Sequence, residues 1–194
     1  MTANTELLEK PLPKPRRDLA AYASARTLEA LLESLLALRF LEQGYTRNAA
    51  SKAFQAWQAL TATILALFQD EITKEPPEKE AKGVKEKALT RIPTTRLKAL
   101  GQLIEKHIPY YAHLTSTALD LHDYQYHGPD PDTELSKYRS RIEAARDIAM
   151  LLDKLVELIE RYVKPELEHR GRWSKEHEQA LQELLREFKR RGQK

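Results

Sequence analysis

The residues best suited to chemistry lie together in one short segment, Leu121–Gly128 and the position before it. It combines imidazole, carboxylate and phenol groups: Asp120, His122, Asp123, Tyr126 and His127. A histidine in such surroundings could act as a general acid or base, because its ordinary pKa lies near neutral pH. The same groups could instead bind a polar ligand without reacting with it.

Helical spacing divides these groups between two faces. Residues four apart share a face of a helix, so Asp123 lies beside His127, and His122 lies beside Tyr126. Asp123 could therefore orient His127 and fix its tautomer, whereas the two histidines, five apart, point in different directions. The candidate catalytic residues are His122, Asp123 and His127, and the candidate ligand-binding residues are Asp120, His122, Tyr126 and His127.

The segment does not predict a metal site. Two histidines four residues apart would be a specific zinc pattern, but the residue four before His127 is Asp123. The chain has no cysteine, which excludes thiolate metal sites, disulfides and cysteine nucleophiles. Its six glycines form no phosphate-binding loop. We expect neither a metal nor a cofactor.

Most of the remaining chain has the three-to-four-residue apolar spacing of amphipathic helices. We expect helices over about 19–43, 46–71, 94–126, 133–163 and 174–191, with a break or kink in the third at Pro109. No segment has the alternation of a strand. The sequence therefore predicts an all-α fold, an antiparallel bundle of four main helices with an extra C-terminal helix.

Residue types at the helix ends support these limits. The expected N-caps are Asp18, Thr94 or Thr95, Asp132 or Thr133, and Ser174. Gly44 and Gly128 are expected to end the first and third helices, and Pro165 the fourth. The expected organisation is a flexible proline-rich tail over 1–17, a bundle domain over 18–163 with an exposed loop at about 72–92, and a C-terminal helical appendage over 164–194.

The fourth helix carries two adjacent apolar seams with heptad spacing. The first seam consists of Leu135, Tyr138, Ile142, Ala145, Ala149, Leu152, Val156, Ile159 and Val163. The second consists of Ile148, Leu151, Leu155, Leu158 and Tyr162. One seam could pack within the bundle while the other contacts a second copy of the chain, or both could be buried within one chain.

Composition limits the kind of partner. The formal net charge is only +3, from 32 basic and 29 acidic side chains, which does not indicate binding to nucleic acid by bulk charge. No apolar run approaches the ~18 residues that a membrane span needs, and the N-terminus lacks a signal-peptide core. We expect a cytoplasmic protein, and a charged fraction of 31% without cysteine is typical of a thermophile.

Two stretches resemble a known family. Gly44–Trp57 resembles the second-helix signature of the archaeal PaREP-type proteins, and Leu121–His127 resembles their leucine-histidine-x-asparagine-aromatic-tyrosine segment. His122 and Tyr126 take the histidine and tyrosine positions, whereas Tyr124 replaces the usual asparagine. The resemblance covers about residues 28–163. It implies a HEPN-like helical bundle, a class that commonly dimerises and includes ribonucleases and toxin components.

The resemblance also provides a test for ribonuclease activity. Active HEPN proteins carry an arginine, then four to six residues, then a histidine. The arginine positions before His127 hold Asp120, Leu121 and His122, and those before His122 hold Thr115, Ser116 and Thr117. Arg172 and His177 have the right spacing but lie in the appendage. The arginine is thus absent from the segment, and the sequence does not favour an enzyme.

The resemblance and the missing arginine together predict a HEPN-like binding or interaction module. We expect a homodimer with a polar cleft around His122, Tyr126 and His127, and RNA or a nucleotide as its ligand. One alternative is a ribonuclease or toxin-like enzyme that uses His127 as acid or base. Another is a purely structural partner of a second helical protein.

Overall fold

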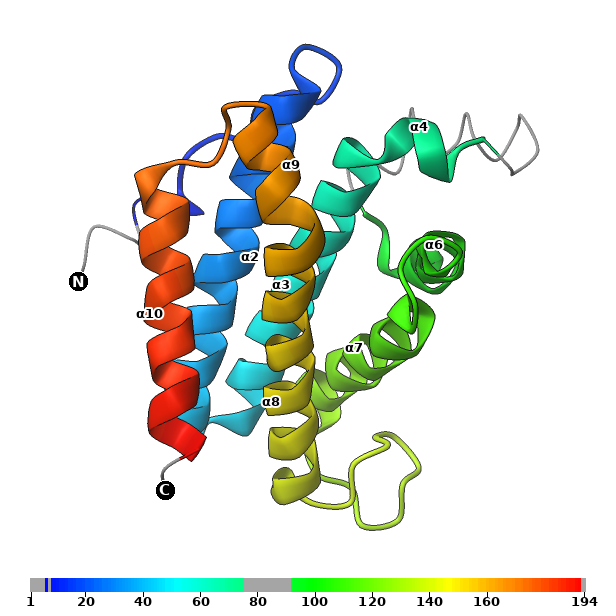
Figure 1. Cartoon of the computed structure of the whole chain (residues 1–194). Helices are drawn as coiled ribbons and strands as arrows, with labels where there is room; N and C mark the ends of the chain where they lie inside the picture. Colours follow the sequence, from blue (N-terminus) through cyan, green and yellow to red (C-terminus); the bar gives the residue numbers. More distant parts are fainter. Residues whose placement is uncertain (1–5, 7, 75–91, 193–194) are drawn as a thin grey trace.

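The computed structural model describes residues 6, 8–74 and 92–192, and these residues form helices and loops without any strand (Figure 1). The all-α class is confirmed for this part of the chain. Most of the expected exposed loop at about 72–92 lies outside the described residues.

The first two helices form an antiparallel hairpin, α2 (Leu19–Glu42) and α3 (Thr46–Leu67). The Asp18 carboxylate accepts a hydrogen bond of 2.8 Å from the Ala21 backbone N–H, which confirms the predicted N-cap of α2. Gly44 has a φ of 80°, a conformation that glycine adopts without a Cβ penalty, so the predicted end is also confirmed.

Helix α3 ends earlier than the sequence predicts. It stops at Leu67 rather than near residue 71, and a short helix α4 (Gln69–Ile72) follows. Phe68 separates the two with φ −112° and ψ 25°, outside helical geometry. The apolar spacing continues through this turn, because Phe68 packs on the core and Ile72 is buried. Hydrophobic spacing alone could therefore not detect the break.

The region around Pro109 holds two helices rather than one kinked helix. Helix α6 (Thr94–Glu105) and helix α7 (Tyr111–His127) are separated by Tyr110, which has a positive φ of 65°. The N-cap of α6 is Pro93, with no side-chain cap, so the prediction of Thr94 or Thr95 as cap was wrong. Helix α7 ends at Gly128, φ 73°, as predicted.

The fourth helix begins later than predicted. Helix α8 (Arg141–Leu158) is capped by the Ser140 hydroxyl and not by Asp132 or Thr133. The Asp130 carboxylate accepts hydrogen bonds from the backbone N–H groups of Leu135 (2.7 Å) and Ser136 (3.3 Å). These bonds organise a loop before α8, since such local side-chain bonds compete with helix formation.

Pro165 does not end the fourth helix either. A π-helical turn (Ile159–Val163) follows α8, and helix α9 (Lys164–His169) continues through Pro165. Pro165 is tolerated because it lies in the first turn of α9, where its missing N–H removes no helical bond. Helix α10 (Lys175–Gly192) begins directly after Ser174.

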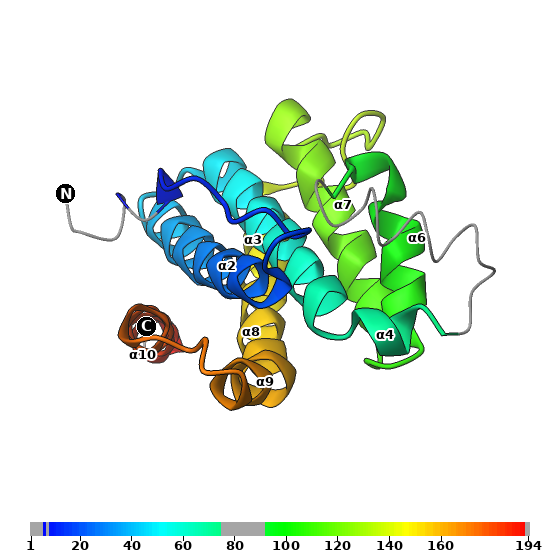
Figure 2. The same cartoon turned by 90° about the horizontal axis from the view of Figure 1, so that it is seen from above.

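Helix α3 lies at the centre of this arrangement (Figures 1 and 2). It packs against α2 on one side, α6 and α7 on another, and α8 on a third. Most of its residues from Ala49 onward are buried, and many are alanines that allow the neighbouring helices to approach closely. Helix α10 packs against α2.

The two seams of α8 have different environments. Ile148, Leu151, Leu155 and Leu158 of the second seam are buried, as are Leu152, Val156, Ile159 and Val163 of the first. Leu135 and Ile142, at the start of the first seam, are 66% and 61% exposed. Leu135, in the loop before α8, and Ile142, in its first turn, are thus the most exposed members of the two seams, whereas Tyr138 between them is buried.

Helices α6 and α7 approach each other closely at Gly101. A Cβ atom built at Gly101 would lie 2.7 Å from Thr115 Oγ1 and 2.9 Å from Thr115 Cβ, closer than van der Waals contact allows. Thr115 cannot easily move, because its buried hydroxyl accepts a hydrogen bond of 3.1 Å from Trp57 Nε1 and donates one of 2.8 Å to the Tyr111 carbonyl.

We predict that Gly101→Ala destabilises the protein. Steric crowding should lower the free energy of unfolding by about 1–3 kcal/mol, reduced by the roughly 1 kcal/mol that alanine gains over glycine in a helix. Urea denaturation measures the difference. The matched control is Gln102→Ala, at the exposed neighbouring position, which should change stability by less than about 0.5 kcal/mol. Equal stability of the two variants would contradict the close approach.

Candidate functional site

The last turns of α7 are held by the first turn of α3. The hydroxyls of Thr46 and Tyr124 share a hydrogen bond of 2.8 Å. Arg47 donates from Nε to the Gln125 carbonyl (2.9 Å) and from Nη2 to the Tyr126 carbonyl (2.5 Å). These carbonyls belong to the C-terminal turn of α7, whose acceptors have no partner within the helix. Arg47 therefore caps the segment that the sequence singles out.

A cavity of about 720 Å³ opens beside this segment, between α2, α3, α7 and the start of α6. We call it the His122 cavity. Its wall combines aromatic rings, amides, hydroxyls and one guanidinium: Tyr22, Arg26, Phe54, Gln55, Gln58, Thr94, Thr95, His122, Gln125 and Tyr126. Leu12 and Ile92, from the segments before α2 and α6, also line it.

Three neighbours fix the ring of His122. It lies against Phe54 with ring centroids 4.2 Å apart and planes tilted by 32°. Tyr126 meets it edge-on, with centroids 5.3 Å apart. The Gln125 Nε2 atom lies 2.5 Å from His122 Nδ1. The side-chain amide of Gln125 is therefore within hydrogen-bond distance of this ring nitrogen.

The environment favours a neutral His122. Burial lowers its pKa from the ordinary value, although the nearby negative charge of Asp123 raises it in part. A neutral imidazole offers one hydrogen-bond donor and one acceptor. His122 is thus better suited to stacking and hydrogen bonding than to carrying a positive charge.

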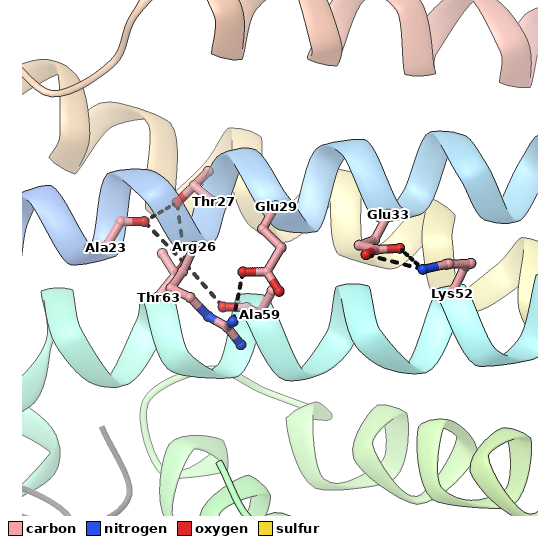
Figure 3. Close-up of polar contacts among 8 residues, drawn as sticks. All are labelled: Ala23, Arg26, Thr27, Glu29, Glu33, Lys52, Ala59 and Thr63. Carbon is pink, nitrogen blue, oxygen red and sulfur yellow. Dashed lines mark hydrogen bonds and ion pairs between the residues drawn. The ribbon is translucent and has the colours of Figure 1, made fainter. Parts of the chain in front are cut away.

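Two ion pairs lie near the cavity, one within α2 and one between α2 and α3 (Figure 3). Arg26 Nη1 lies 2.6 Å from Glu29 Oε2, and Lys52 Nζ lies 3.0 Å from Glu33 Oε2. Lys52 also donates to Gln55 Oε1 at 2.8 Å. Burial raises the pKa of Glu29 and Glu33, against the lowering effect of their cationic partners. Of these four charged side chains only Arg26 lines the cavity, and it is paired with Glu29.

The structure separates the sequence-predicted residues into two groups. His122 and Tyr126 line the cavity together. His127 and Asp123 are exposed and do not line it, and no hydrogen bond or ion pair joins them within the described residues. The nearest aromatic ring to His127 is that of Tyr126, with centroids 6.5 Å apart.

Asp120 also lies apart from the cavity. It is half-buried, and burial together with the negative charge of Asp123 raises its pKa. Lys137 and Lys98 lower the pKa in part, and Asp147 raises it. Within the described residues, no cluster of three or more histidine and carboxylate side chains could hold a metal ion.

Several residues that line the cavity could not be predicted as site residues from the sequence. Phe54 belongs to an apolar stripe of α3, so the sequence predicts a core residue, although its ring packs against that of His122. Arg26, Gln55 and Gln58 are single polar residues on long helices. Their contribution depends on how α2, α3 and α7 pack, which spacing along one helix does not give.

The comparisons with known proteins identify one family. A family model described as the archaeal PaREP1/PaREP8 family matches residues 25–149, more than half of the chain. The match includes Arg26, Phe54, His122 and Tyr126. Comparisons with curated proteins and with solved structures give no match. Among the described residues, no helix is long and apolar enough to cross a membrane.

We predict that Arg47→Ala loosens the end of α7. Losing two hydrogen bonds from an exposed guanidinium should cost about 1 kcal/mol of stability and speed amide hydrogen exchange at the end of α7. Hydrogen–deuterium exchange with mass spectrometry measures the local effect. Asn48→Ala, at the exposed next position, is the control and should leave this exchange unchanged. Unchanged protection of α7 in Arg47→Ala would show that the cap does not hold the segment.

Proposed function

The chain belongs to the archaeal PaREP1/PaREP8 family, and we propose that it is a helical module that binds a ligand. The family model covers the residues of the cavity wall from Arg26 to Tyr126, so we propose that other members of the family share this binding function. In this proposal the His122 cavity binds a planar, polar ligand and does not transform it. The observation that carries the proposal is the placement of the His122 ring, which lies against Phe54 and beside Gln125 at an open cavity.

The cavity wall favours a nucleobase as the bound group. Bases stack on aromatic side chains and form hydrogen bonds with amides along their edges. Tyr126, 62% exposed, and His122 form a right-angled aromatic corner, with Gln55, Gln58 and Gln125 nearby. Arg26, paired with Glu29, is the one charged side chain among the described residues that line the cavity. A nucleotide or a short single-stranded RNA is therefore the proposed ligand.

A HEPN-type ribonuclease that uses His127 is the weaker alternative. His127 is exposed, lies outside the cavity and has no carboxylate partner among the described residues to orient it. His122 keeps a lowered pKa, which disfavours the imidazolium that could replace the missing arginine. A purely structural role beside another helical protein would leave the cavity without a use.

We further propose a HEPN-like bundle of α2, α3, the α6–α7 pair and α8, with residues 164–194 as an appendage. In this proposal two copies associate through the start of the first α8 seam. Leu135 and Ile142 support this choice, because large apolar side chains so exposed commonly mark a contact surface.

We predict that His122→Ala weakens the binding of fluorescently labelled single-stranded RNA and of nucleoside monophosphates. Loss of one stacking contact should cost about 1–3 kcal/mol, or roughly 5- to 150-fold in Kd. Fluorescence anisotropy and calorimetry measure the two ligands. The RNA should remain intact during the measurement.

The matched control is His127→Ala, on the last turn of the same helix, which should bind as the wild type does. If neither ligand binds the wild type, the nucleobase proposal is wrong. Cleavage of RNA that His127→Ala abolishes would establish the enzyme alternative.

We predict that the protein is a dimer at micromolar concentration, with a light-scattering mass twice that of one chain. Ile142→Glu should give a monomer, because a charge would have to be buried at the contact. Lys154→Glu, exposed further along α8, should remain dimeric. A monomeric wild type would exclude the proposed association.

A further inference from the structure

Helix α10 is attached to α2 through a buried histidine, His177. Its side chain is only 3% exposed, although it lies in the first turn of α10. Both ring nitrogens have partners. Nε2 lies 2.8 Å from the Ser24 carbonyl of α2, and Nδ1 lies 2.8 Å from Ser174 Oγ and 3.2 Å from the Ser174 backbone N–H. Trp173 covers the ring, with centroids 5.0 Å apart.

These contacts define one protonation state. The Ser24 carbonyl can only accept, so Nε2 carries a proton. The Ser174 backbone N–H can only donate, so Nδ1 must offer a lone pair. This is the neutral imidazole. A second proton, on Nδ1, would break the hydrogen bond from the Ser174 backbone N–H, leave the Ser174 hydroxyl as the acceptor on that side and place a positive charge in a buried site.

The charged groups around His177 do little to stabilise its cation. Burial lowers the pKa of His177, and the Ser24 carbonyl and the Glu176 carboxylate raise it only in part. From the side of α2, Asp18 pairs with Arg172 at 2.8 Å. On α10, Glu178 pairs with Lys164 of α9 at 2.8 Å.

The same neighbourhood includes a second cavity, of about 450 Å³, between α2, the segment before it and the start of α10. It adds two further charges near His177, Lys10 of the N-terminal segment and Glu29 of α2. Glu29 is paired with Arg26. The Glu176 carboxylate is thus the main negative charge that could favour protonation.

We propose that His177 is a protonation-sensitive latch, which holds the first turns of α10 on α2 while its ring is neutral and releases them when the ring takes up a proton. The inference is independent of the proposed function, because α10 lies outside both the His122 cavity and the matched residues 25–149. Release of these turns would uncover Ala180 and Leu181, which are now buried, and would open the second cavity.

The middle and the far end of α10 are held differently. Arg39 pairs with Glu183 at 2.5 Å, and Arg190 pairs with Glu42 at 2.6 Å. These are partly exposed ion pairs, whose contribution to stability is small and hardly depends on pH near neutrality. Opening is therefore expected to begin at His177 and to leave the second half of α10 in place for longer.

The direction of the pH effect follows from linkage. The docked state lowers the pKa of His177, so the released state binds the proton more tightly. Docking is unaffected above the ordinary histidine pKa of about 6.5 and weakens as the pH falls below it. The loss of docking stability becomes constant at a pH low enough for His177 to be protonated in the docked state as well.

Hydrogen–deuterium exchange of the full chain, from about pH 7.5 to about pH 5, tests the latch, because a histidine titrates in this range. After correction for the intrinsic pH dependence of exchange, the first turns of α10 should exchange several-fold faster at the acidic end, while α3 stays protected. In His177→Gln the acceleration should disappear, because the glutamine amide can both donate and accept without titrating. The control is His169→Gln, which changes an exposed histidine of α9 and should leave the acid acceleration of α10 exchange unchanged.

Equal acceleration in α3 and α10 would overturn the proposal, since it would indicate global unfolding. An acceleration that persists in folded His177→Gln would also overturn it. Should that variant not fold, a nuclear magnetic resonance titration of the wild type decides. The midpoint of the His177 ring signals must coincide with that of α10 exchange, and separate midpoints exclude the latch.

Discussion

The close packing around α3 is the constraint on which the other features depend. Helix α3 is rich in alanine, and Ala49, Ala53, Ala56 and Ala59 are fully buried. Small side chains allow α2, α7 and α8 to lie near the same helix without voids. Its few larger groups then specify which neighbour lies where. Trp57 meets Tyr111 of α7, with ring centroids 4.8 Å apart, and donates a hydrogen bond to Thr115.

The position of the His122 cavity follows from this packing. The first turn of α3 holds the end of α7 through Thr46 and Arg47, and Phe54, two turns later, supports the ring of His122. The side chain of His127, the last residue of α7, is exposed. One helix therefore explains why two histidines only five residues apart have different surroundings, and why His122 carries the proposed function.

Local signals in the sequence were sufficient for several features of the fold. The Asp18 cap, the ends at Gly44 and Gly128 and the break at Pro109 each depend on a few adjacent residues, and the structure confirms them. One of the predicted helix ends that were wrong lies where a side chain forms hydrogen bonds that compete with those of the helix. At the start of α8, Asp130 binds backbone N–H groups that the predicted helix would have used.

The site was predictable only in part, for a related reason. Helical spacing placed His122 beside Tyr126, and both line the cavity. The same spacing paired Asp123 with His127, but both are exposed and no contact joins them in the described part of the chain. Arg26, Phe54 and Gln58 reach the cavity from other helices. Spacing gives neighbours within one helix, whereas a cavity depends on contacts between helices.

The central claim is that His122, and not His127, faces the ligand. The side-chain nitrogen resonances of the histidines, recorded while uridine and adenosine monophosphates are added, test it most directly. We expect the His122 signals to shift with saturation and to keep the pattern of a neutral ring, while those of His127 stay in place. Saturable shifts at His127 with His122 unchanged would contradict it.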